Sequence, residues 1–271
     1  MPSSTCYTRE VKKIALITGA SSGFGSEFAK LFARDGYDLI LVARSQDVLE
    51  SLARELKREF DIFVKVIAID LSDSKSPEKI FEIVETANLT VNVLINNAGF
   101  ATYGEFVKLP KKDELDEIAV NVVSLTHLTK LFLPGMVQRK EGRILNVAST
   151  AAFLPGPLMA VYYATKAYVL HFSEALSEEL KGTGVTVTVL CPGPSKTGFS
   201  TRAKLENSPL FNGHIMDAKK IVAIGYKGLM QDQTVIIPGI LSKFLIEVPR
   251  FFSRSFMRRV IKKMQTEKTG V

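Results

Sequence analysis

The chain has 271 residues, of which 46% are hydrophobic, so it can bury a full core near the upper size limit of one domain. Of its net charge of +7, the stretch 241–271 carries +6, and the nearly neutral remainder argues against a nucleic-acid-binding domain. The two cysteines, Cys6 and Cys191, lie too far apart in sequence for a metal motif and form no disulfide framework, which favours a reducing, cytoplasmic location. We find no apolar run of about 20 residues and no secretory signal pattern, and therefore expect no membrane-spanning helix.

Short apolar stretches alternate with helical patterns along the chain. Residues 1–12 are polar and are expected to form a loose arm. Strands are predicted at 14–18, 38–44, 62–69, 91–95, 142–149, 184–191 and 234–237. The order predicts an α/β fold, a doubly wound (Rossmann) parallel sheet of about seven strands with helices on both faces. We expect one domain over 13–240 and a C-terminal extension over 241–271.

A glycine-rich turn follows the first predicted strand and precedes a helix. Its glycines, Gly19, Gly23 and Gly25, have the spacing Gly-x-x-x-Gly-x-Gly. Glycines let the backbone approach a pyrophosphate, and the helix N-terminus offers it free N–H groups. The turn therefore predicts a dinucleotide site, although a glycine-rich turn without a ligand would have the same sequence.

The residues that end the second, third and fourth predicted strands indicate which dinucleotide binds. Arg44 ends the second strand, and no acid follows before Asp47, which favours the 2′-phosphate of NADP(H) over the ribose hydroxyls of NAD, unless Arg44 only caps the strand and faces water. Asp70 ends the third strand, where it could accept a hydrogen bond from an adenine amino group or cap the following turn. The fourth strand runs into Asn96-Asn-Ala-Gly99, whose small residues leave room for a ribose or form a simple turn.

Three residues near the end of the fifth strand suggest acid–base chemistry. Tyr162 and Lys166 are four residues apart, so they share one helix face, and Ser149 precedes Tyr162 by thirteen residues. A cation near a phenol lowers its pKa, which would let Tyr162 exchange a proton with a substrate oxygen held by Ser149. The same pattern also arises from an aromatic residue packed beside a solvated lysine. Asn121 lies inside a long helix predicted over 112–137; if buried there it indicates a local kink with a bound water, and otherwise it is a tolerated polar residue.

Together these motifs resemble the short-chain dehydrogenase/reductase family over about residues 13–240. The resemblance implies that Tyr162 is the catalytic acid, Ser149 polarises the carbonyl, Lys166 lowers the pKa of Tyr162 and holds the nicotinamide ribose, and Asn121 holds a water. Phe24 departs from the aliphatic residue that is commoner in the family, but its N–H should still serve. The implied NADPH/NADP+ site comprises Gly19, Ser21, Ser22, Gly23, Phe24, Gly25, Arg44, Ser45, Asp70, Leu71, Asn97, Ala98, Gly99, Tyr162, Lys166, Pro192, Gly193 and Thr197.

The family resemblance also implies a ketone substrate and subunit contacts through the helices of Asn121 and Tyr162, hence a homo-oligomer (dimer or tetramer). A lid is expected over 198–230. Apolar residues there and in the facing wall favour a lipophilic or 3-oxoacyl-type substrate, unless they only pack the lid to the core. These residues are Phe153, Leu154, Pro155, Leu158, Met159, Phe199, Leu205, Pro209, Leu210, Phe211, Ile215 and Met216.

The alternative function is a non-catalytic NADP(H)-binding regulatory protein. Residues 250–264 predict a basic amphipathic helix, which either contacts an anionic membrane surface or packs on a subunit.

Overall fold

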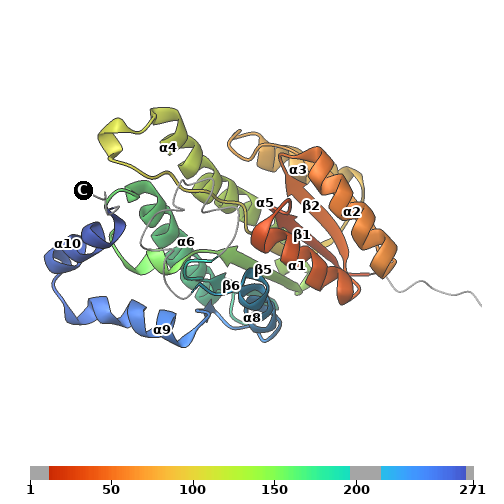
Figure 1. Ribbon diagram of the computed structural model, residues 1–271. Helices are drawn as coiled ribbons and strands as arrows, with labels where there is room; N and C mark the ends of the chain where they lie inside the picture. The colour runs from red at the N-terminus through yellow and green to blue at the C-terminus, as the bar shows by residue number, and fades with distance from the viewer. Residues whose placement is uncertain (1–11, 196–214, 267–271) are drawn as a thin grey trace, which may run out of the picture.

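The computed structural model describes residues 12–195 and 215–266 and has a seven-stranded parallel sheet at its centre (Figure 1). The strand order is β3-β2-β1-β4-β5-β6-β7, which confirms the predicted doubly wound fold. The strands are β1 (Ile14–Thr18), β2 (Asp38–Ala43), β3 (Val64–Ala68), β4 (Val91–Asn96), β5 (Gly142–Val147), β6 (Val185–Leu190) and β7 (Val235–Ile236). The order reverses between β1 and β4, and such a reversal opens a crevice at the carboxyl ends of the strands.

Helices cover both faces of the sheet, because its strands are apolar on both sides. One face is covered by α1 (Gly23–Arg34), α2 (Gln46–Phe60) and α8 (Ala218–Met230), with Phe28 and Phe32 fully buried in its core. The other face is covered by α3 (Ser76–Thr86), α5 (Leu125–Arg139) and α6 (Ala160–Glu179), around Leu128 and Phe132. Within the predicted lid, the residues from Ala218 onward form α8, whose Ile221 and apolar neighbours pack on the sheet.

The long helix predicted over 112–137 is interrupted where Asn121 lies. It consists of α4 (Lys111–Ile118), a π-helical turn η2 (Ala119–Ser124) and α5. A π-helical turn inside an α-helix is a recurrent feature of functional sites, and it lies where the sequence predicted an irregularity in the helix. By length and composition alone, the whole of Lys111–Arg139 could cross a membrane, which the sequence analysis did not recognise. The α5 part of this stretch belongs to the folded core, because Leu128, Phe132 and Met136 are buried against the sheet.

The C-terminal extension contains two helices, where the sequence predicted one over 250–264. α9 (Ile240–Glu247) is followed by the short 3-10 turn η5 (Val248–Phe251) and then by α10 (Arg254–Gln265). Ser253 ends the intervening turn, because its hydroxyl accepts the N–H of Phe256 at 3.2 Å and so caps α10. In Figure 1, α9 and α10 lie at the opposite end of the molecule from α2.

Candidate active site

The ends of β1 and β4 are tied together at the reversal of strand order. The Thr18 hydroxyl accepts the N–H groups of Asn97 and Ala98, each at 3.0 Å. The Asn97 amide nitrogen donates to the Thr18 carbonyl at 2.8 Å and to the Gly19 carbonyl at 3.3 Å. Asn97 therefore holds the glycine turn with its side chain, which agrees with a structural role for the predicted Asn96-Asn-Ala-Gly99 turn.

The glycine turn packs too closely against neighbouring backbone to accept a side chain at Gly19 or Gly25. Gly19 has φ +66°, and a Cβ built there would lie 2.9 Å from the Ala98 Cα; a Cβ on Gly25 would lie 2.2 Å from the Gly19 carbonyl oxygen. α1 starts at Gly23, its N-cap Ser22 makes no side-chain capping hydrogen bond, and its first turn contains no acid. The first-turn N–H groups can thus bind an anion, so this part of the chain fits a dinucleotide pyrophosphate.

Arg44 and Asp70 lie side by side at the ends of β2 and β3. The Arg44 Nη1 is 3.8 Å from the Asp70 Oδ2, and both side chains are about half exposed. Burial pushes the pKa of Asp70 up, but hydrogen bonds from Ser72 and the charge of Arg44 outweigh it and lower that pKa. Arg44 is a cation at the position that favours a 2′-phosphate, next to an ionised Asp70. Ser45 lies at the N-cap position of α2 without a side-chain capping hydrogen bond, and Leu71 is buried three residues after the end of β3.

Tyr162 and Lys166 project from one face of α6 toward the end of β5. Both are buried, and the Lys166 Nζ donates to the Val147 carbonyl at 2.8 Å. The same Nζ lies 5.7 Å from the centroid of the Tyr162 ring. The Tyr162 and Ser149 side chains share a hydrogen bond. The fold therefore brings together the three residues on which the predicted acid–base chemistry depends.

Asn121 completes this cluster from the π-helical turn. Its Oδ1 accepts the Phe100 N–H at 3.1 Å, and its Nδ2 donates to the Phe100 carbonyl at 2.9 Å and to the Thr165 hydroxyl at 3.1 Å. A Cβ built on Gly99 would lie 3.0 Å from the Asn121 Oδ1 and 3.4 Å from the Lys166 Nζ. Gly99 thus keeps the backbone close to both polar groups.

The pKa of Tyr162 shifts in the direction opposite to the one that the sequence predicted. Burial raises the pKa of Tyr162, and its hydrogen bond with Ser149 opposes this only in part. Burial also lowers the pKa of Lys166 to about 8, while the charge of Glu117 raises it. We expected Lys166 to lower the pKa of Tyr162; instead, burial disfavours the ionised form of each residue, and the charges of Tyr163 and Glu117 raise the pKa of Tyr162 further.

Glu117 is a buried acid that sequence reasoning missed. Its Oε2 accepts the N–H and the hydroxyl of Thr102, each at 2.8 Å, and the same hydroxyl also contacts Glu114. Burial raises the pKa of Glu117 to about 7, although its hydrogen bonds with Thr102 oppose this. Glu117 lies one helical turn before Asn121, and this i,i+4 spacing was the available signal.

The wall expected to face the substrate is apolar. Phe153, Leu154, Pro155 and Leu158 are half-buried, and Met159 is buried. Leu158 has φ +68°, a backbone conformation that is uncommon for a leucine, and strained conformations of this kind cluster at functional sites.

Of the remaining predicted site residues, Pro192 and Gly193 lie in the described part of the loop after β6, and others lie outside the described residues. Pro192 follows β6, and its carbonyl accepts the Thr150 N–H at 2.9 Å; a Cβ on Gly193 would lie 3.0 Å from the Ser242 hydroxyl. Thr197 lies outside the described residues, as do Phe199, Leu205, Pro209, Leu210 and Phe211 of the predicted lid.

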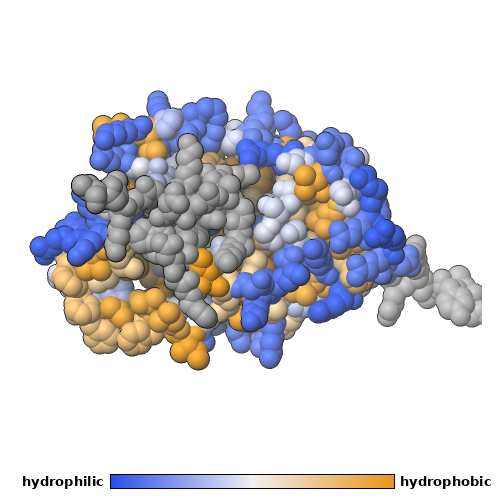
Figure 2. Space-filling view, viewed as in Figure 1, coloured by the Kyte–Doolittle hydropathy of each residue, from blue (hydrophilic) through white to orange (hydrophobic). Residues whose placement is uncertain are grey.

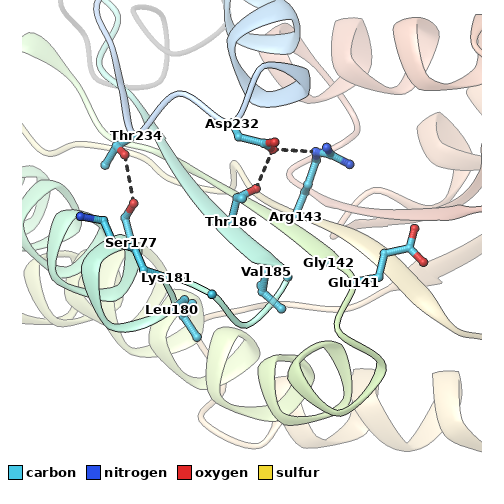
Figure 3. Close-up of a pocket in the computed structure, with 12 residues that line it drawn as sticks. Glu141, Gly142, Arg143, Ser177, Leu180, Lys181, Val185, Thr186, Asp232 and Thr234 are labelled. Atoms are coloured by element: carbon cyan, nitrogen blue, oxygen red, sulfur yellow. Dashed lines mark hydrogen bonds and ion pairs between the residues drawn. The ribbon is translucent and has the colours of Figure 1, made fainter.

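A separate surface pocket lies at the other end of the sheet, where β5 and β6 begin (Figure 3). Arg143 pairs there with Asp232 at 3.1 Å, and Thr186 donates to the same carboxylate at 3.0 Å. The predicted catalytic residues do not line this pocket, so it is not the candidate active site.

Comparisons with known proteins agree with this architecture. The family model of the short chain dehydrogenases matches residues 13–208. Very-long-chain 3-oxoacyl-CoA reductase of Bos taurus is 38% identical over 182 residues, covering 66% of this chain but only 58% of that protein. The protein of the same name from Phaeosphaeria nodorum is 32% identical over 277 residues, covering 93% of this chain and 80% of that protein. The structure of a short-chain dehydrogenase from Sphingobium yanoikuyae in complex with NADPH matches with a TM-score of 0.79 and 30% identity, covering 96% of this chain and 98% of that one. The family model matches most of the chain, and the fold and the glycine turn agree with that match. The chain therefore belongs to the short chain dehydrogenase family.

Proposed function

We propose that this protein is an NADPH-dependent carbonyl reductase that reduces a lipophilic ketone of the 3-oxoacyl type. The convergence of Ser149, Tyr162, Lys166 and Asn121 at the carboxyl ends of the strands carries this proposal. A bound nicotinamide would supply the hydride, and the chain must supply the proton and the orientation.

Each of the four residues has a role that follows from its contacts. Tyr162 donates its proton to the carbonyl oxygen, and Ser149, which is hydrogen-bonded to Tyr162, holds that oxygen. As the proton leaves, Lys166 stabilises the developing phenolate because it lies over the same ring. Asn121 positions the loop at Phe100, and we retain the expectation that it also holds a water.

Arg44 supports NADP(H) as the cofactor, since it ends β2 with its guanidinium about half exposed. The Sphingobium structure contains NADPH, which agrees with this choice. The direction is therefore proposed as reduction. The proposed cofactor-binding residues are those of the glycine turn, the ends of β2 to β4 and the loop after β6.

Two observations support the substrate class. The described wall beside Tyr162 is apolar, and the two curated relatives are named very-long-chain 3-oxoacyl-CoA reductases. A lipophilic chain would contact the apolar wall while its keto group reaches Ser149 and Tyr162.

NADPH oxidation measured against ketones of graded chain length and ring number tests the proposal. We expect rates to rise with apolar surface, and equal rates across the panel would contradict the lipophilic site. Tyr162→Phe should lose turnover and keep cofactor affinity. If the unaltered protein binds NADPH but reduces no ketone, the non-catalytic alternative is correct.

The surface supports two further proposals about partners. Exposed apolar side chains on the helices that carry Asn121 and Tyr162, among them Leu115, Val123 and Tyr168, support a homo-oligomer. The apolar and basic side chains of 250–264 support peripheral contact of a cytoplasmic protein with a membrane.

A further inference from the structure

α9 and the turn after it expose an unusual number of large apolar side chains. Ile240 is 88% exposed, Phe244 66% and Phe251 83%, and Leu241 and Leu245 are also more than half exposed. Figure 2 shows these hydrophobic residues gathered as one patch over α9 and η5. A contiguous exposed apolar patch of this kind marks an interaction surface.

α10 places a row of cations directly beside this patch. Its five basic residues lie on the solvent side, and α10 contains no acid; they are Arg254, Arg258, Arg259, Lys262 and Lys263. Phe256 and Met264 on the same helix are 43% and 47% exposed. Met257 and Ile261 are buried, so the inner side of α10 anchors the helix and its outer side remains available.

We propose that the outer surface of α9, η5 and α10, hereafter the docking face, binds an anionic lipid bilayer. Its aromatic and aliphatic side chains would enter the acyl–headgroup boundary while its cations contact anionic headgroups. This extends the predicted contact at 250–264 to α9, which contributes the most exposed apolar residues of the extension.

Charge distinguishes a bilayer from a second copy of the chain. A twofold contact through the docking face would bring two sets of five cations together, and like charges repel across an interface. The rest of the chain carries +1 of the net charge, so a second copy offers no net negative charge that would attract the docking face. An anionic bilayer complements both the charge and the apolar surface.

The inner side of α10 connects the docking face to the candidate substrate wall. Gln265 is fully buried; its side-chain Nε2 donates to the Tyr163 hydroxyl at 2.7 Å, and its backbone carbonyl accepts from the Tyr103 hydroxyl at 2.5 Å. Tyr163 and Tyr103 pack in the same cluster as Tyr162 and Met159. Docking would therefore hold the substrate wall next to the bilayer. This step rests on the proposed function, and it lets a lipophilic ketone pass from membrane to site.

Sedimentation with lipid vesicles tests the docking face without any need for activity. The unaltered full chain is mixed with vesicles of phosphatidylcholine alone or with about one third phosphatidylglycerol. We expect binding to the anionic vesicles that weakens at least tenfold between about 0.05 M and 0.5 M salt. No binding to the anionic vesicles would overturn the proposal.

Paired variants separate the docking face from the rest of the surface. Phe244→Ser with Phe251→Ser, and Arg258→Glu with Lys262→Glu, should each weaken vesicle binding at least tenfold. The matched controls lie at the other end of the molecule. They are Arg54→Glu with Arg58→Glu on exposed positions of α2, and Phe63→Ser at the exposed residue just before β3. Equal losses in the controls would overturn the proposal.

Oligomeric mass and kinetics complete the test. If the Phe244/Phe251 variant changes mass in sedimentation equilibrium but keeps vesicle binding, a second copy occupies the docking face and the proposal is wrong. Anionic vesicles should lower the KM for a long-chain ketone in the unaltered chain more than in this variant, and equal lowering would overturn the substrate route. A chain that binds vesicles but reduces no ketone contradicts the proposed function and leaves the docking face supported.

Discussion

Replacement of Glu117 by glutamine should make the protein more stable at alkaline pH. Glu117 is fully buried, and burial raises its pKa from the ordinary value of 4.5 to about 7. Because the folded state binds this proton more tightly than the unfolded state, the free energy of unfolding falls as pH rises from about 4.5 to 7. Glutamine keeps an acceptor for Thr102 and cannot ionise.

The size of the effect follows from the two pKa values of Glu117. Their difference corresponds to about 3 kcal/mol, at about 1.4 kcal/mol for each pKa unit. This is an upper bound, because the amide nitrogen of the glutamine would need a buried hydrogen-bond acceptor. The Glu117 Oε1, whose place this nitrogen could take, has no hydrogen-bond partner among the described residues. For a chain of this size, about 3 kcal/mol corresponds to a rise in Tm of roughly 6–12 °C.

Thermal and urea unfolding at pH 5 and pH 8 measure this effect. We expect a clear gain for Glu117→Gln at pH 8 and a much smaller one at pH 5. The exposed Glu59→Gln on α2 is the control and should change little at either pH. A gain of equal size at both pH values, or a loss at pH 8, would refute the reasoning. Glu114 and Lys166 are the other ionisable groups acting on Glu117, so Lys166→Met should be measured alongside.

Four further changes test the active site. Tyr162→Phe should lower kcat by roughly 10²–10⁴-fold with unchanged NADPH affinity, measured by turnover and by cofactor fluorescence titration. Arg44→Asp should weaken NADPH binding more than NADH binding, and equal weakening of both would overturn the NADP assignment. Gly25→Ala should destabilise the protein by about 1–3 kcal/mol and weaken cofactor binding, because its Cβ would lie 2.2 Å from the Gly19 carbonyl oxygen; unchanged binding in a titration would contradict the tight turn. Since the pKa of Lys166 is about 8, kcat should fall as pH rises through 8, and a flat profile between pH 7 and 9 would show that its charge is not required.

Local patterns in the sequence were sufficient for most of the architecture. The strand at 14–18 was predicted at its observed bounds, since five consecutive apolar or small residues end in a glycine turn. The kink at Asn121 was predicted because an amide competes with helical hydrogen bonds. The C-terminal extension was predicted less well: its basic periodicity is visible, but the break at η5 and the cap at Ser253 depend on how the chain packs there.

The sequence by itself determined the order of strands and helices, the glycine turn and the shared helix face of Tyr162 and Lys166, because these depend on residues close in the chain. Only the tertiary structure decided how far those two side chains are removed from water, and therefore the direction in which their pKa values move. It also decided that Gln265 contacts Tyr163, 102 residues away, and Tyr103, 162 residues away. Burial and long-range contacts arise when remote segments pack together, and no local spacing encodes the distances between them.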